Sequence, residues 1–173
     1  MASSIQQAKL AGFAVPFPRV AASRRLRYEE CYETNRHRVY AVAFWMTDHE
    51  LAAEELMRNI FLRAFASADE PTRELVDRAL IAELREFGAL GLLTLQCAPA
   101  TETLSVRHNI KRIHLERAVV QLPRTERLVF LLHDVEAYDH CLISRLLGLT
   151  EAESRQAVHQ ARLRIRELVA AMN

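Results

Sequence analysis

Cysteine, glycine and proline are all scarce in this chain of 173 residues, which contains 3 Cys, 4 Gly and 5 Pro. The odd number of cysteines and the absence of a CxxC pair argue against a disulfide framework and indicate free thiols in a reducing compartment. Few glycines and prolines mean few helix breakers, and alanine, leucine, arginine and glutamate are abundant. The composition therefore favours a helical protein without disulfide bonds.

The chain also lacks an excess of charge of one sign, and it lacks long apolar runs. The formal net charge is +1, so a surface that binds nucleic acid must arise from local segregation of charge. No apolar run approaches the ~20 residues that span a bilayer. The basic N-terminus has no apolar core before a cleavage site, which argues against a signal peptide. We expect a cytoplasmic protein that is not inserted in a membrane.

Helical periodicity begins near Leu26, after an extension at residues 1–25 that we expect to be flexible. Apolar residues recur at helical spacing over residues 28–46 and again over residues 53–65. This pattern predicts two consecutive amphipathic helices.

Two local signals predict where helices begin. Thr47 and Glu50 have the spacing of a capping box, so we expect the second helix to start there. Pro71 suits the first turn of a helix. A third helix is expected from Pro71 to Leu84 or Leu95.

The chain divides into two helical parts. Residues 96–112 form the predicted linker, because this segment carries a proline and several Thr and Ser without periodicity. Residues 26–95 precede it, and helical patterning resumes over residues 113–173. No alternating run indicates a strand. The predicted fold is all-α, with two small helical bundles joined by a flexible linker.

The last third of the chain has the layout of a helix-turn-helix. A short helix through Ile143 leads to a tight turn at Gly148, and a second helix rich in arginine follows. Thr150 and Glu153 have the spacing of a capping box at the start of that second helix. Such a helix can lie in a DNA major groove, so the pattern predicts duplex binding.

Polar side chains on or near this second helix are the candidates for DNA contacts. They are Arg155, Gln156, His159, Gln160, Arg162 and Arg164. Arginine and glutamine can read guanine and adenine edges, and other basic groups can hold phosphates. The alternative is an amphipathic helix with Leu163, Ile165 and Val169 inward and its arginines in water. The preceding helix and the Gly148 turn favour DNA.

Many positions of the C-terminal part follow one family pattern without a gap. They are Leu122, Pro123, Arg127, Val129, Phe130, Leu131, Leu132, Glu136, Ile143, Leu147, Gly148, Ala161, Arg162, Ile165 and Arg166. This pattern resembles sigma region four of ECF-type sigma factors, the small promoter-specificity subunits of bacterial RNA polymerase. The resemblance implies partners: promoter DNA, core RNA polymerase and, as is common in the family, an anti-sigma factor.

Residues 53–56 and 60–65 are similar to sigma region two, in which this helix docks on the clamp helices of the polymerase β′ subunit. The resemblance implies that one helix face contacts polymerase. Its residues are Glu54, Glu55, Arg58, Asn59 and Arg63. The alternative is a solvated face whose ion pairs contribute only ~0.2–0.5 kcal/mol each.

The sequence departs from the family pattern at three places. Glu151 and Glu153 lie where DNA phosphates would approach, and Ser154 replaces an apolar residue that packs on the preceding helix. Arg58 and Asn59 replace a glutamine-glutamate pair. Residues 75–90 lack the aromatic and basic stretch for promoter melting, which needs stacking surfaces and positive charge. Trp45 lies one helix too early to replace it, and we interpret it as a core residue.

No enzyme, cofactor or metal site is predicted. The spacing of His133, His140, Cys141 and His159 fits no common zinc pattern, and Cys141 is expected to pack as a small apolar residue. No nucleophile with its base and no glycine-rich phosphate loop is present.

The sequence therefore predicts a sigma factor that directs core polymerase to specific promoters. One alternative is a sigma-like interaction protein that binds polymerase or an anti-sigma factor without melting promoters. The other is an ordinary helix-turn-helix regulator that binds a palindrome as a dimer.

Overall fold

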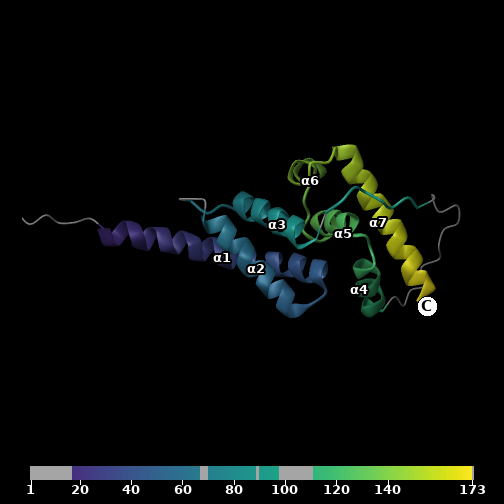
Figure 1. Cartoon of the computed structure of the whole chain (residues 1–173), viewed down its shortest axis with the longest axis horizontal. Coiled ribbons are helices and arrows are strands. Elements are labelled where there is room, and N and C mark those ends of the chain that lie inside the picture. Colours follow the sequence, from purple (N-terminus) through teal and green to yellow (C-terminus); the bar gives the residue numbers. More distant parts are fainter. Residues whose placement is uncertain (1–16, 67–69, 89, 98–110, 173) are drawn as a thin grey trace, which may run out of the picture.

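The computed structural model describes residues 17–66, 70–88, 90–97 and 111–172, and within these ranges the chain forms helices and no strand. The elements are α1 (Phe17–Thr47), α2 (Glu50–Ala66), α3 (Arg73–Phe87), α4 (Arg112–Val120), α5 (Arg124–Phe130), the π-helical turn η1 (Leu131–Val135), α6 (His140–Leu147) and α7 (Glu151–Ala171) (Figure 1). The predicted all-α fold is confirmed. None of the described helices is both long and apolar enough to cross a bilayer.

Helices α1, α2 and α3 pack together as an N-terminal unit. The two predicted apolar stripes face each other, with Val42 of α1 and Ile60 of α2 fully buried. Edge-on aromatic contacts extend this packing, since the Tyr32 and Phe61 ring centroids lie 4.8 Å apart. Helix α1 begins at Phe17 rather than near Leu26, and its first turns project beyond the other helices (Figure 1). The remainder of the expected flexible extension, residues 1–16, lies outside the described part.

The capping box predicted at Thr47 and Glu50 is wrong. Thr47 is the last residue of α1, and its hydroxyl donates to the Ala43 carbonyl at 2.9 Å. The chain then bends at Asp48, which has a positive φ of 54°. The His49 ring nitrogen Nδ1 accepts the N–H of Ala52 at 3.4 Å, so His49 takes the capping position in front of α2.

Helix α3 starts close to the predicted point and ends before Leu95. The Thr72 hydroxyl caps its first turn by accepting the N–H of Leu75 at 3.3 Å. Beyond Phe87 the chain leaves helical geometry, and residues 90–97 run along the C-terminal helices. There the buried Glu126 carboxylate accepts the N–H of Leu95 at 2.7 Å. Most of the predicted linker, residues 98–110, lies outside the described part.

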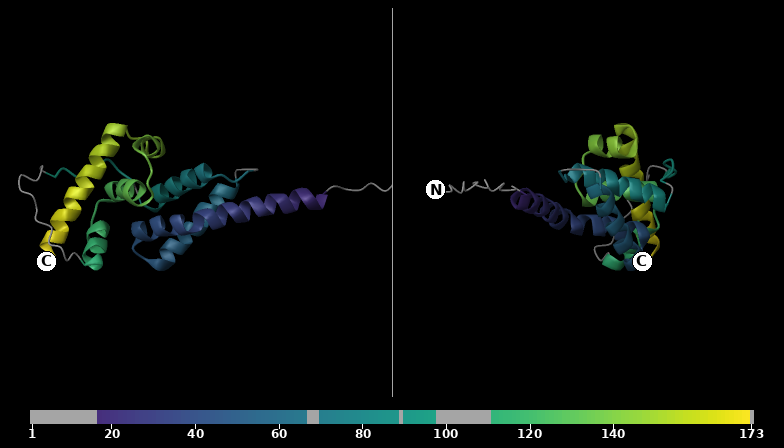
Figure 2. Two further views of the ribbon diagram at one scale, coloured as in Figure 1. Left: turned by 180° about the vertical axis from the view of Figure 1, so that it is seen from behind. Right: turned by 60° about the vertical axis from the view of Figure 1, so that its left-hand side comes forward.

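Helices α4 to α7 form a C-terminal unit in which α7 packs against α4, α5 and α6. Figure 2 shows α7 as a long helix on the side of this unit that lies away from α1 and α2. The buried residues Leu128, Leu132 and Ile143 supply the centre of the unit. Arg127 is also buried there, and its guanidinium donates to the Leu122 carbonyl at 3.0 Å.

Buried polar contacts join the two units. Asp77 of α3 is 4% exposed, and its carboxylate accepts from Arg38 of α1 at 2.6 Å and from the Tyr138 hydroxyl at 2.7 Å. We call Arg38, Asp77 and Tyr138 the interdomain network. Arg127 adds a second connection, donating to the Trp45 carbonyl at 3.2 Å. In this structure helices α1 and α3 of the N-terminal unit contact helices of the C-terminal unit.

Removal of the Asp77 carboxylate should destabilise the protein strongly. Asp77→Ala leaves the Arg38 guanidinium buried without its partner, and such losses cost about 3–5 kcal/mol. The matched control is Glu74→Ala, which removes an exposed pair with Arg78 on the same helix and should cost at most about 0.5 kcal/mol. Urea unfolding monitored by circular dichroism measures both. Equal losses in the two variants would contradict a structural role for the interdomain network.

Candidate nucleic-acid interface

The helix-turn-helix is built by local caps at each of its ends. The Asp139 carboxylate accepts the N–H of Leu142 at 2.6 Å and so opens α6. Gly148 closes α6 with φ of 74°, a conformation that glycine adopts without steric cost. Thr150 and Glu153 form a reciprocal capping box at the start of α7, as predicted.

Helix α7 has one buried face and one exposed face. Ala157, Ala161 and Ile165 belong to the buried face, which packs on the C-terminal core. Five candidate DNA residues of α7 are exposed, namely Arg155, Gln156, His159, Arg162 and Arg164, and we call this set the recognition face; Arg164, nine residues after Arg155, lies about half a turn around the helix from it. The structure thus exposes five of the six predicted residues.

Gln160 does not share this exposure. It is 6% exposed, and its amide oxygen accepts the N–H of Cys97 at 2.5 Å. The side chain therefore holds Cys97 against α7, a role that sequence spacing could not show. Gln160 is not part of the recognition face.

Each arginine of the recognition face has a carboxylate partner. Arg155 pairs with Glu151 at 2.7 Å and Arg164 with Glu167 at 3.0 Å, both along α7. Arg162 makes two hydrogen bonds to Asp134 of η1, at 2.6 and 2.8 Å. These guanidiniums are about half exposed, so the pairs are weak. A phosphate can exchange with the carboxylates.

Two histidines lie behind the recognition face. The His133 and His140 rings stack with centroids 4.4 Å apart. His133 Nδ1 lies 2.7 Å from Asp134, and His140 Nδ1 shares a hydrogen bond of 2.9 Å with the fully buried Ser154 hydroxyl. Ser154 therefore replaces the apolar family residue with a polar contact to α6. The sequence analysis considered His133 and His140 only as metal ligands, and it did not anticipate their stacking or the contact of His140 with Ser154, which depends on how α6 packs on α7.

Asp134 is the acidic member of this cluster. Partial burial opposes its ionisation, but hydrogen bonds from Arg162 and His133 outweigh burial and lower the pKa of the carboxyl group. Asp134 thus stays charged and holds the Arg162 guanidinium in place. Among the described residues, no group of three or more His, Cys, Asp or Glu side chains has the arrangement of a metal site.

Cys141 differs from the sequence expectation. The side chain is exposed rather than packed as a small apolar residue. The buried residue of α6 is Ile143, which faces α7 and the core.

The predicted polymerase-contact residues lie on the outward part of α2. Glu54, Glu55, Arg58 and Arg63 are exposed, and Asn59 is half-buried. Arg58 and Glu55 form an exposed pair at 3.5 Å. Arg63 instead reaches α3, where it pairs with Glu83 at 2.6 Å and Glu86 at 2.5 Å. Arg63 therefore also fixes α2 on α3.

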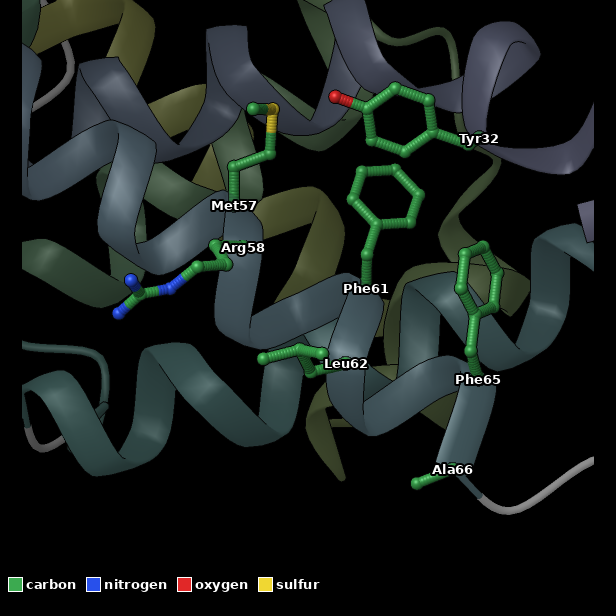
Figure 3. Close-up of a pocket in the computed structure, with 7 residues that line it drawn as sticks. All are labelled: Tyr32, Met57, Arg58, Phe61, Leu62, Phe65 and Ala66. Atoms are coloured by element: carbon green, nitrogen blue, oxygen red, sulfur yellow. The ribbon is translucent and has the colours of Figure 1, made fainter. Parts of the chain in front are cut away.

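An apolar groove lies beside this α2 surface. It is lined by Tyr32, Met57, Arg58, Phe61, Leu62, Phe65 and Ala66 (Figure 3). Leu62 is 64% exposed at its rim. The charged residues of α2 thus adjoin an apolar depression, a combination that suits a protein contact.

Helix α3 supplies little surface for single-stranded DNA. Its apolar residues Leu80, Ile81 and Leu84 are buried in the core. The exposed aromatic ring is Phe87, which is 48% exposed and lies under the Arg124 guanidinium at 6.0 Å. Trp45 is partly buried and packs on the core, as predicted. As inferred from the sequence of residues 75–90, α3 therefore offers little aromatic surface on which bases could stack.

Comparison with known protein families gives a match, which lies within the C-terminal unit. Residues 112–165 match the family model described as sigma-70, region 4. A search of curated proteins found no match to the chain. The matched range covers α4 to most of α7 and includes the whole helix-turn-helix. This match agrees with the resemblance of the C-terminal residues to sigma region four.

Acidification should loosen the helix-turn-helix through His140. Burial, the His133 ring and the Arg155 and Arg162 guanidiniums lower the pKa of His140. A histidine with a lowered folded-state pKa stabilises the fold above its unfolded value of about 6.5, and this contribution is lost as the pH falls below that value. The thermal midpoint of the wild type should therefore fall between about pH 7.5 and about pH 5.5 more steeply than that of His140→Gln.

The matched control for this titration is Gln156→Ala, which removes no titratable group at an exposed position of α7. It should keep the wild-type slope of thermal midpoint against pH. Parallel slopes for wild type and His140→Gln would show that His140 does not couple acidity to the stability of this unit.

Proposed function

We propose that the protein is a sigma factor that directs core RNA polymerase to specific promoters, because residues 112–165 match the family model described as sigma-70, region 4. In this proposal α7 reads the upstream promoter element as duplex DNA. The observation that supports it most is the recognition face, a set of exposed Arg, Gln and His side chains on a helix capped at its start by Thr150 and Glu153.

The proposal divides the recognition face by position. Residues near the start of a recognition helix contact base edges, so Arg155 and Gln156 are assigned to base reading. Arg162 and Arg164, further along α7, are assigned to phosphates. Glu153 does not compete for this surface, because it is held in the capping box and hydrogen bonds from Thr150 lower the pKa of its carboxyl group. Glu151 is paired with Arg155.

The N-terminal unit is assigned to core polymerase. The exposed charges of α2 and the adjoining apolar groove offer a polar and an apolar contact on one surface. We assign this surface to the β′ clamp helices. An anti-sigma factor would compete for the same surface or for the recognition face. The ECF subtype rests on the sequence resemblance.

One observation favours a second candidate function. Helix α3 buries its apolar residues and exposes one aromatic ring, Phe87, whereas promoter melting requires surfaces on which bases can stack. A sigma-like interaction protein that binds polymerase or an anti-sigma factor without melting promoters would not need them. The two candidates differ in whether the protein supports promoter opening by core polymerase.

Loss of recognition-face arginines should weaken binding to the protein's selected duplex. Arg155→Ala should cost about 1–3 kcal/mol of binding free energy through a lost base contact. Arg162→Ala should reduce the slope of log affinity against log salt by about 0.9 through a lost phosphate contact. Fluorescence anisotropy over a salt series, on a duplex selected from a random pool, measures both effects.

The control for these duplex measurements is Arg25→Ala, at an exposed position of α1. It should keep the wild-type affinity and salt slope. Unchanged binding by both α7 variants would remove Arg155 and Arg162 from the DNA contact.

A further inference from the structure

A cleft of about 290 Å³ lies between α3 of the N-terminal unit and α6 of the helix-turn-helix. Three arginines line it, Arg78 and Arg85 from α3 and Arg145 from α6, against a single carboxylate, Glu74. Its apolar lining includes Ile81 and Leu142, among others. The cleft thus combines an excess of positive charge with an apolar surface.

The three guanidiniums differ in how far they are engaged within the protein. Arg78 pairs with Glu74 at 2.6 Å. Arg85 donates to the Leu147 carbonyl at 3.0 Å and so covers the negative end of the α6 dipole. Within the described part of the chain, Arg145 has no hydrogen-bond or ion-pair partner and is exposed. Donor groups are therefore available to a ligand without loss of a structural contact.

Some surface arginines here pair with a carboxylate on their own helix, as Arg155 and Arg164 do. Arg145 instead lines a cleft whose one carboxylate, Glu74, is already paired with Arg78. Arginine presents a planar fork of donors that matches phosphate oxygens.

We propose that the cleft between α3 and α6 binds a phosphate group, held by Arg145 together with Arg78 and Arg85. The phosphate belongs either to a small phosphorylated molecule or to the backbone of DNA, which present the same chemistry. A phosphate bound here contacts both units at once and stabilises their packed arrangement. This inference is independent of the proposed function, because it does not use the recognition face.

Calorimetric titration of the full chain with pyrophosphate, at constant ionic strength, tests the cleft directly. We expect saturable binding that Arg145→Ala weakens tenfold or more, since a hydrogen bond between charged groups is worth about that factor. The matched control is Arg166→Ala, an exposed arginine of α7 outside the cleft, which should bind as the wild type does. Arg145→Ala removes no contact of the fold, and circular dichroism should show an unchanged unfolding transition.

A second arm identifies the source of the phosphate. The same three proteins are titrated with a short DNA duplex, with and without pyrophosphate. The cleft binds the DNA backbone if three results are found together. Pyrophosphate shows no saturable binding, Arg145→Ala lowers the affinity for the duplex about tenfold, and Arg166→Ala leaves that affinity unchanged. If Arg145→Ala changes neither affinity, or Arg166→Ala changes both equally, the cleft assignment is overturned. Failure here leaves the Arg155 and Arg162 measurements unaffected, so the two proposals fail separately.

Discussion

The rest of the structure depends on the buried carboxylate of Asp77. It receives Arg38 from α1 and the Tyr138 hydroxyl from the segment that leads into α6, and so it fixes the helix-turn-helix relative to the N-terminal helices. A buried charge is tolerated only when it is paired and hydrogen-bonded. Tyr138 is delivered to this position by Ala137, which adopts a positive φ of 56°, a conformation that is costly for alanine. The network therefore sets where α6 begins.

A second constraint acts on the recognition face. Its arginines are held by Glu151, Asp134 and Glu167, so a duplex must replace these carboxylates with phosphates or bases. Exposed ion pairs of this kind are weak. Because each pair must be broken before its arginine can contact a phosphate, the net free energy gained from non-specific phosphate contacts is smaller. Discrimination between specific and non-specific DNA then depends more on the contacts that the matching base sequence makes. Asp134 also contacts His133, one of the two stacked histidines. The conformation of the turn between η1 and α6 therefore affects the position of the Arg162 side chain.

The parts of this fold that sequence predicted correctly are those encoded by local chemistry. Gly148 and the Thr150–Glu153 pair specify the turn and the start of α7 from residues that lie next to each other. The failures involve contacts that are distant in sequence. Thr47 has the spacing of a cap, but α1 continues through it, and Gln160 has the chemistry of a base reader, but a hydrogen bond from Cys97 draws it inward. The Asp77 network likewise joins Arg38, Asp77 and Tyr138, which no local pattern associates.

The most direct test of the central claim is run-off transcription from fragmented host DNA by host core polymerase, with and without this protein, followed by sequencing of the transcripts. If the chain couples a polymerase-binding unit to a DNA-reading helix, new transcripts will start at a fixed distance from a shared two-part motif. If no new starts appear although the protein co-elutes with core polymerase, the sigma-factor account is contradicted and the interaction-protein alternative takes its place.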